Sequence, residues 1–136
     1  MSRGINFIFI LLTIIIIFFL YISKNDIFDE TNMYGTWVGE LHSSQIKMHI
    51  NKDYTCELNV IDYKKEIEIK YNGICKFNFK KKPQTLSISK IDKVGSLYAS
   101  FQFENENTLF VTKFANQEKL INILIIKENS FKLTKK

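Results

Sequence analysis

The chain has 136 residues, of which 46% are hydrophobic and 14% aromatic, with five Gly and one Pro. This composition excludes a disordered or fibrous chain and suits one small folded domain. The net charge of +5 comes almost entirely from Lys, which is interleaved with Asp and Glu and forms no basic stripe, so we expect no nucleic-acid partner.

Residues 5–22 read INFIFILLTIIIIFFLYI and contain no charged side chain. As a helix they would extend roughly 27 Å, close to the hydrocarbon thickness of a bilayer. No small-residue cleavage site follows them, which disfavours a cleaved signal peptide, and no Cys follows that could carry a lipid. A helix without a polar face could not be covered by so small a domain. We therefore predict a short tail at 1–4, a transmembrane anchor at 5–22 and a linker at 23–33.

The orientation of this anchor is decided only weakly by the flanking charges. Arg3 precedes the apolar segment and Lys24 follows it, which is a tie under the positive-inside rule. The position of the segment near the N-terminus and the lack of a further span favour export of the C-terminal part. We expect a single-pass protein of the cell membrane with an extracytoplasmic domain.

From residue 34 onward, apolar residues recur at every second position, the pattern of strands with one buried face. Polar turn-forming clusters separate the runs, at 51–53, 80–83, 92–95, 104–107 and 116–118. The run LINILIIK at 120–127 is apolar on both faces. Eight or nine short strands are expected, mostly antiparallel, in an up-and-down barrel or a sandwich. Closure removes exposed edges and favours an all-β barrel over residues 34–136.

Four short motifs carry a resemblance to a known family. They are YGTWVG at 34–39, NKDYT at 51–55, YNGIC at 71–75 and TLSI at 85–88. In this order they resemble the small lipocalin-like domains of bacterial envelope proteins, which have G-x-W, a D-G-T hairpin, then G-x-Y or G-x-W before L-x-L. Tyr54 replaces the Gly of the second motif and Cys75 an aromatic of the third. The resemblance implies a calycin-like barrel whose interior sometimes holds an apolar ligand.

Inward-facing aromatic residues are the candidates for lining such an interior. We assign this role to Trp37, Tyr71, Phe77 and Phe101. Trp37 has an alternative, because an eight-stranded barrel is just wide enough to be filled by its own side chains. In that interpretation it fills one barrel end as a core residue, and its flanking glycines allow close approach of the backbone.

The two cysteines, Cys56 and Cys75, both fall on the predicted inward face. A hairpin that turns near residues 65–66 would pair Cys56 with Cys75 and Val60 with Tyr71, within disulfide reach. We therefore predict a disulfide in an exported domain, and the alternative is a pair of buried thiols in a cytoplasmic one. The wide spacing lacks the close cysteine pairs of a zinc site, so no metal is expected.

No residue cluster indicates a catalytic site. His42 and His49, the only histidines, fall at a strand end and on a polar strand face, where solvated side chains are usual. No nucleophile or phosphate-binding motif accompanies them. The basic run at 80–82 suits a solvated turn better than an anionic partner. We expect a protein that is not an enzyme and uses no cofactor.

These expectations give a membrane-anchored β-domain of the cell envelope that binds a protein partner or an apolar small molecule. The alternative is an inhibitor or immunity-type protein that neutralises an enzyme in the same compartment. An exposed aromatic patch, for instance at Phe110 and Phe114, would favour a protein partner over a small ligand.

Overall fold

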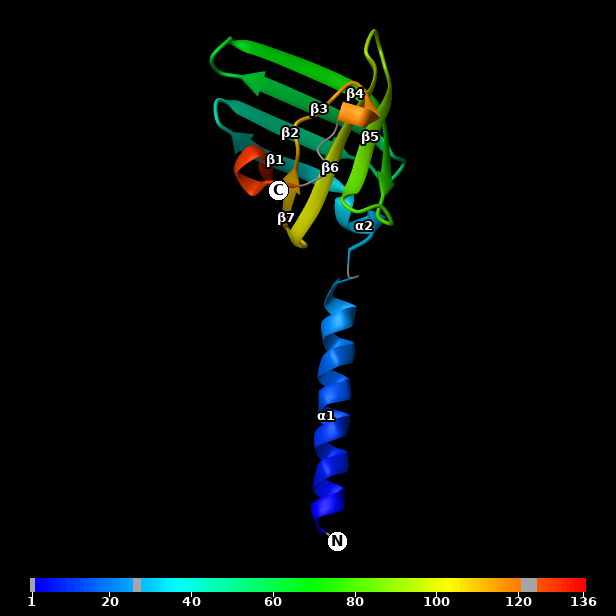
Figure 1. Cartoon of the computed structure of the whole chain (residues 1–136). Helices are drawn as coiled ribbons and strands as arrows, with labels where there is room; N and C mark the ends of the chain where they lie inside the picture. The colour runs from blue at the N-terminus through cyan, green and yellow to red at the C-terminus, as the bar shows by residue number, and fades with distance from the viewer. Residues whose placement is uncertain (1, 26–27, 121–124) are drawn as a thin grey trace.

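A computed structural model of the chain describes residues 2–25, 28–120 and 125–136. Two helices come first and eight strands follow, with two short 3-10 helices before the last strand (Figure 1). The elements are α1 (Ser2–Asn25), α2 (Glu30–Met33), β1 (Gly35–Leu41), β2 (Ser44–Ile50), β3 (Thr55–Asp62), β4 (Ile67–Asn78), β5 (Gln84–Ile91), β6 (Gly95–Asn105), β7 (Thr108–Val111), η1 (Glu118–Leu120), η2 (Lys127–Asn129) and β8 (Phe131–Lys135).

The first helix, α1, contains the predicted apolar segment. Its window Arg3–Leu20 has a mean hydropathy of 2.5, and none of that window is buried against the rest of the chain. The apolar side chains are exposed, from 44% at Ile15 to 69% at Phe9. A helix that is apolar on every side and covered by nothing is long and apolar enough to cross a membrane, although a signal sequence would have the same character.

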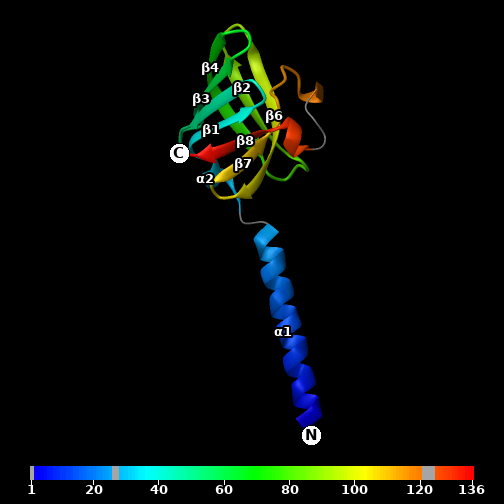
Figure 2. The ribbon, with the colours of Figure 1, turned by 90° about the vertical axis from the view of Figure 1, so that its left-hand side faces the viewer.

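The predicted antiparallel barrel is confirmed. Each strand pairs with the next along the chain, and β8 returns to pair with β1 and close the barrel (Figure 2). Closure needs a close approach at Gly39, because a Cβ added there would overlap the backbone of Lys132 on β8. The glycine after Trp37 therefore allows the first and last strands to meet, as the sequence suggested.

The barrel has a closed end and an open end. At the closed end lie α2, the turns after β2 and β4 and the chain's C-terminus, and at the open end lie the turns after β1, β3 and β5. Met33 of α2 is completely buried, and its carbonyl oxygen accepts a hydrogen bond of 2.9 Å from Nε1 of Trp37, itself completely buried. Phe28 stacks on Phe103 with ring centroids 4.7 Å apart. These contacts seal the closed end.

Residues 28–33, predicted as part of a linker at 23–33, instead form a helix and contacts with the barrel. Residues 26 and 27 of that predicted linker lie outside the described residues. Asp29 caps the N-terminus of α2, since its carboxylate accepts hydrogen bonds from Thr31. In turn, the backbone N–H of Asp29 donates a hydrogen bond to the side-chain oxygen of Asn32. These bonds hold the pKa of Asp29 below its usual value. Glu30 accepts a hydrogen bond of 2.7 Å from the Tyr54 hydroxyl, which raises the pKa of that phenol. The segment is therefore anchored to the barrel through both ends.

The register predicted for the β3–β4 hairpin is wrong by two residues. Cys56 lies opposite Gly73 and Val60 opposite Ile69, not opposite positions 75 and 71. The cause is the turn, because Asp62 accepts hydrogen bonds from the N–H groups of residues 64 and 65 and starts the turn earlier than expected. A shift of two residues keeps the same side chains inward, so the predicted faces remain correct.

The structure also differs from the expected strand set in two places. The runs at 67–71 and 75–79 belong to a single strand, β4, except for residue 79, which lies just beyond the end of that strand. In the run at 120–127, residues 121–124 lie outside the described residues, and the described remainder forms no strand: Leu120 ends η1 and Lys127 begins η2. The described part of the connection from β7 to β8 therefore contains two short 3-10 turns and no strand.

Several turn residues adopt left-handed backbone conformations that usually favour glycine. Lys93 has φ of 66° in the exposed β5–β6 turn. We expect Lys93→Gly to raise the free energy of unfolding by about 0.5–1 kcal/mol, since left-handed strain exceeds the extra freedom that glycine gives the unfolded chain. Urea unfolding measures this change. The matched control is Asp92→Gly in the same turn, which should destabilise; a gain from both variants would contradict the explanation by backbone strain.

Candidate functional site

A hollow at the open end of the barrel is the main candidate site. It has a volume of about 340 Å³ and is lined by Ser44, Ile46, Leu58, Val60, Tyr71, Leu97, Lys113, Phe114 and Phe131. These residues come from β2, β3, β4, β6, β8 and the loop after β7. Their side chains are mostly apolar, with a hydroxyl from Ser44 and an exposed ammonium from Lys113. We call this hollow the mouth cavity.

The alternation of the strands explains which side chains line the mouth cavity. Leu58 and Val60 are two apart on the inward face of β3, and Tyr71 lies directly opposite Leu58 on β4. Leu58 is buried, whereas Val60 and Tyr71 are only partly buried, so the cavity opens outward as the strands rise above the core. Beyond them, Ile69 is 43% exposed although it points to the same face.

Of the four predicted ligand-binding residues, only Tyr71 lies at the mouth cavity. Trp37 and Phe101 are completely buried, and Phe77 is 7% exposed. Phe101 packs edge to face against Phe77 and Phe103, at centroid distances of 6.4 Å and 6.1 Å. The other half of the barrel is therefore filled by its own aromatic side chains, and Trp37 occupies the core position that was its alternative interpretation.

Sequence reasoning did not single out most of the cavity. Val60 and Leu97 were on the predicted inward faces, but alternation alone does not tell which inward residues lie near an open end. Phe114 and Lys113 follow β7 in an irregular segment that has no periodic pattern. The distance of an inward residue from the next turn would have indicated that it lies near an open end, because Val60 comes only two residues before the end of its strand.

The aromatic residues expected in an exposed patch are not exposed together. Phe110 is 5% exposed, and the Lys127 ammonium lies 5.0 Å from its ring centroid. Phe114 is partly buried and lines the mouth cavity. Phe110 is buried with the Lys127 ammonium over its ring, and Phe114 lines the mouth cavity, so this pair forms no exposed aromatic patch.

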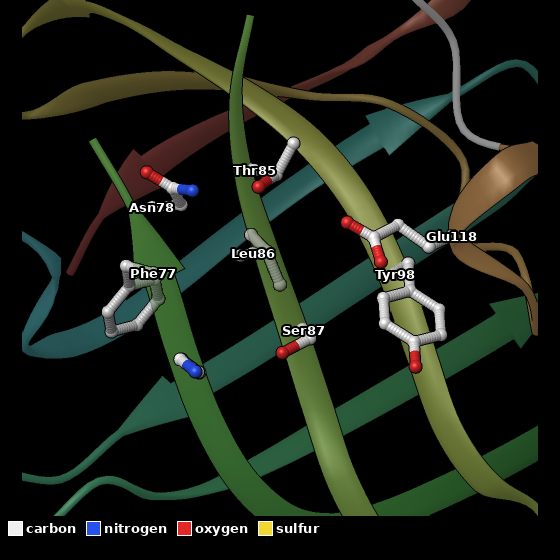
Figure 3. A pocket seen from close by; sticks show the side chains of 8 residues that line it. Phe77, Asn78, Thr85, Leu86, Ser87, Tyr98 and Glu118 are labelled. Atoms are coloured by element: carbon white, nitrogen blue, oxygen red, sulfur yellow. The ribbon is translucent and has the colours of Figure 1, made fainter. Parts of the chain in front are cut away.

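A second, smaller hollow lies on the outer face of β4, β5 and β6. Figure 3 shows its polar side chains, which include Asn78, Thr85, Ser87 and Tyr98 on neighbouring strands and Glu118 on η1. Its volume is about 260 Å³. Ser87 lies opposite Tyr98 in the register, so these groups form a row across the sheet surface. We call it the outer groove. Phe77, one of the predicted ligand-binding residues, and Leu86 also line it, but most of its lining is polar.

Cys56 and Cys75 are joined by a disulfide, with Cα atoms 6.0 Å apart. Both are 2% exposed. Because Cys56 faces Gly73, the bond runs diagonally between β3 and β4 and not between opposed residues. A Cβ at Gly73 would overlap the Ser89 carbonyl group of β5, so this glycine lets β4 and β5 approach closely.

Among the residues that the structure describes, neither histidine forms a hydrogen bond with a carboxylate. Nδ1 of His49 lies 2.6 Å from the Thr36 hydroxyl oxygen, and its Nε2 lies 3.0 Å from Oδ1 of Asn51. His42 lies in the turn after β1 with φ of 54°. Within the described residues, no group of three or more His, Cys, Asp or Glu side chains could hold a metal ion. Glu57 lies opposite His49 in the register of β2 and β3, but the two ring nitrogens have Thr36 and Asn51 as their partners.

Comparisons with family models, with curated proteins and with solved structures give no match for this chain.

Proposed function

We propose that this chain is a noncatalytic binding protein of the cell envelope, anchored by α1, whose barrel takes an apolar small molecule in the mouth cavity. The observation that carries this proposal is the mouth cavity itself, an apolar hollow of about 340 Å³ next to a filled core. That volume lies at the lower end of the range for small-molecule sites. At about 30 Å³ for each water-sized unit, it suits a ligand with on the order of ten non-hydrogen atoms.

The chain connection directs the mouth cavity away from the membrane. Only residues 26–29 separate α1 from α2 at the closed end, and the five Cα–Cα steps from Asn25 to Glu30 reach at most about 18 Å. With α1 in a bilayer, the closed end stays near its surface and the open end faces the surrounding compartment. We infer that a ligand enters from that compartment and does not slide in from the lipid.

Two features support placing the barrel outside the cytoplasm. One is the Cys56–Cys75 disulfide, because disulfides persist in oxidising compartments and are rare in the cytoplasm. The apolar α1 is the kind of segment that export machinery recognises. The resemblance to lipocalin-like envelope domains points to the same location and to an apolar ligand, and it remains part of the proposal.

The proposal is tested by titrating the purified barrel, residues 28–136 with the disulfide intact, with linear alkanols of increasing length and counting bound molecules by native mass spectrometry. Each added methylene group should raise the affinity about fourfold, from about 0.8 kcal/mol per buried group, until about ten carbons fill the cavity. Longer chains should gain little. A lack of binding at any length would refute the proposed ligand class.

A matched pair of variants identifies the hollow that binds. Val60→Trp places a large side chain at the rim of the mouth cavity and should weaken alkanol binding at least tenfold, because it occupies the space that the ligand needs. Ser87→Trp fills the outer groove and should leave the affinity unchanged. Equal losses in both variants, or a loss only in Ser87→Trp, would contradict the assignment to the mouth cavity.

A further inference from the structure

The first half of β4 has a free edge. β4 pairs with β3 from Ile67 to Ile74, but it pairs with β5 only from Ile74 to Asn78. In Figure 1 this half runs along the upper margin of the sheet, and β5 meets β4 only further along. Across the ranges that the structure describes, no strand pairs with residues 67–72 on that side. We call these residues the β4 edge.

The irregular end of β5 explains why the edge is free. The register between β5 and β6 shifts between Ile88 and Ile91, and Lys90 has φ of 57°. A bulge with a left-handed residue bends its strand, so β5 turns away from β4 after Ser89. The barrel wall therefore separates at this place, and the side chains of Ile67 and Ile69 are 45% and 43% exposed.

The direction of the backbone groups follows from one hydrogen bond. The Cys75 N–H donates to the Tyr54 carbonyl oxygen just before β3. Since backbone groups alternate between the two sides of an antiparallel strand, odd-numbered residues of β4 bond toward β3. The N–H and C=O groups of Glu68, Lys70 and Asn72 therefore point to the free side. Such a row of groups is a template for another strand.

The sequence of the β4 edge is complementary to itself. We propose that two copies of this chain pair antiparallel through the β4 edge, about a twofold axis at Ile69. Glu68 of each copy then lies opposite Lys70 of the other, and Ile67 lies opposite Tyr71. The charged pairs lie on the outer face and the apolar pairs on the inner face, because alternate side chains point to opposite faces.

Other symmetric registers lack this complementarity. An axis at Glu68 would oppose two carboxylates, and an axis at Lys70 would oppose two ammonium groups. An axis at Tyr71 would pair Ile69 with Gly73 and lose an apolar contact. Glu68 is already held on the outer face, since its Oε1 accepts a hydrogen bond of 2.9 Å from the Asn59 amide. Charge complementarity therefore selects a second copy and a single register.

The pairing is small, so it depends on the membrane anchor. About five residues from each copy meet, fewer than the 20–30 of a stable interface. The twofold axis is normal to the sheet, so the closed ends and the α1 helices of the two copies point in opposite directions. The copies therefore belong to two facing membranes, where many pairs forming together compensate for weak contacts. This step rests on the proposed anchoring by α1, and the strand pairing itself does not rest on ligand binding. The free barrel should be monomeric at micromolar concentration, and the full chain should pair between vesicles that carry it.

The experiment places single cysteines along the β4 edge of the full chain, reconstituted in phosphatidylglycerol vesicles and mildly oxidised. Ile69→Cys should give a disulfide-linked dimer, because residue 69 meets its own copy at about 4.5 Å between Cα atoms. Ile67→Cys or Tyr71→Cys alone should give at least fivefold less dimer, since each meets the other position. A mixture of Ile67→Cys and Tyr71→Cys chains should restore it.

Charge reversal provides the matched control for this register. In the Ile69→Cys chain, Glu68→Lys should lower the dimer yield at least fivefold, and the further change Lys70→Glu should restore it, because the pair is then inverted. Intact Cys56–Cys75 bonds show that each variant is folded. Equal dimer at positions 67, 69 and 71, a monomer at position 69, or a double reversal that fails to restore dimer would overturn the proposal, whatever the outcome of the alkanol titration.

Discussion

Replacement of both cysteines by alanine should lower the free energy of unfolding of the barrel by about 3 kcal/mol. The Cys56–Cys75 bond joins residues 19 apart in sequence, and closing a loop of that length removes entropy worth about 3 kcal/mol from the unfolded chain. Both side chains are buried, so a smaller packing loss adds to this value. Urea unfolding, followed by the fluorescence of Trp37, measures the change.

Reductant separates the covalent effect from the packing effect. Added dithiothreitol should lower the stability of the native chain by most of the same 3 kcal/mol, because it opens the loop and keeps the sulfur atoms in place. The double alanine variant has no disulfide, so its stability should not respond. If mass spectrometry shows that the native chain is fully reduced and its stability equals that of the oxidised chain, the bond does not constrain the unfolded state.

The strand pattern predicted the barrel because each strand has one buried face and closure leaves a single inside. Met48, Leu58 and Ile88 were read as inward and are all buried at 1% exposure or less. The register of the β3–β4 hairpin was missed because a two-residue slip leaves that alternation unchanged. Only the side-chain hydrogen bonds of Asp62 fix where the turn starts.

The open and closed ends could not be assigned from alternation. Whether an inward side chain is enclosed depends on where strands separate, and β4 separates from β5 because of a bulge that has no hydrophobic signature. Alternation therefore groups Tyr71 with Trp37 and Phe101, although Tyr71 lies in the mouth cavity and the other two lie in the core. Tyr54 has a φ of 69°, a left-handed backbone conformation in which glycine is usual.

The closed end depends on α2, a segment too short for helical periodicity to reveal. Met33→Ala should lower the free energy of unfolding by about 2–5 kcal/mol, because it removes a completely buried side chain beneath Trp37 and leaves a cavity. The matched control is Thr31→Ala on the exposed side of the same helix, which removes only the hydroxyl hydrogen bond to Asp29 and should cost about 1 kcal/mol or less. Urea unfolding of the barrel, residues 28–136, gives both values.

Two starting points for the chain distinguish a core element from a linker at this position. A barrel that begins at residue 34 should lose at least as much stability as Met33→Ala, because it also lacks the Phe28 stack on Phe103 and the Glu30 contact with Tyr54. In that shortened barrel the Trp37 indole keeps no carbonyl acceptor and becomes open to water, so its fluorescence should shift to longer wavelength. Equal stability and equal emission in the two barrels would mean that residues 28–33 serve only to connect the anchor. A loss confined to the shorter one makes residues 28–33 a structural part of the closed end, which the barrel needs for its stability.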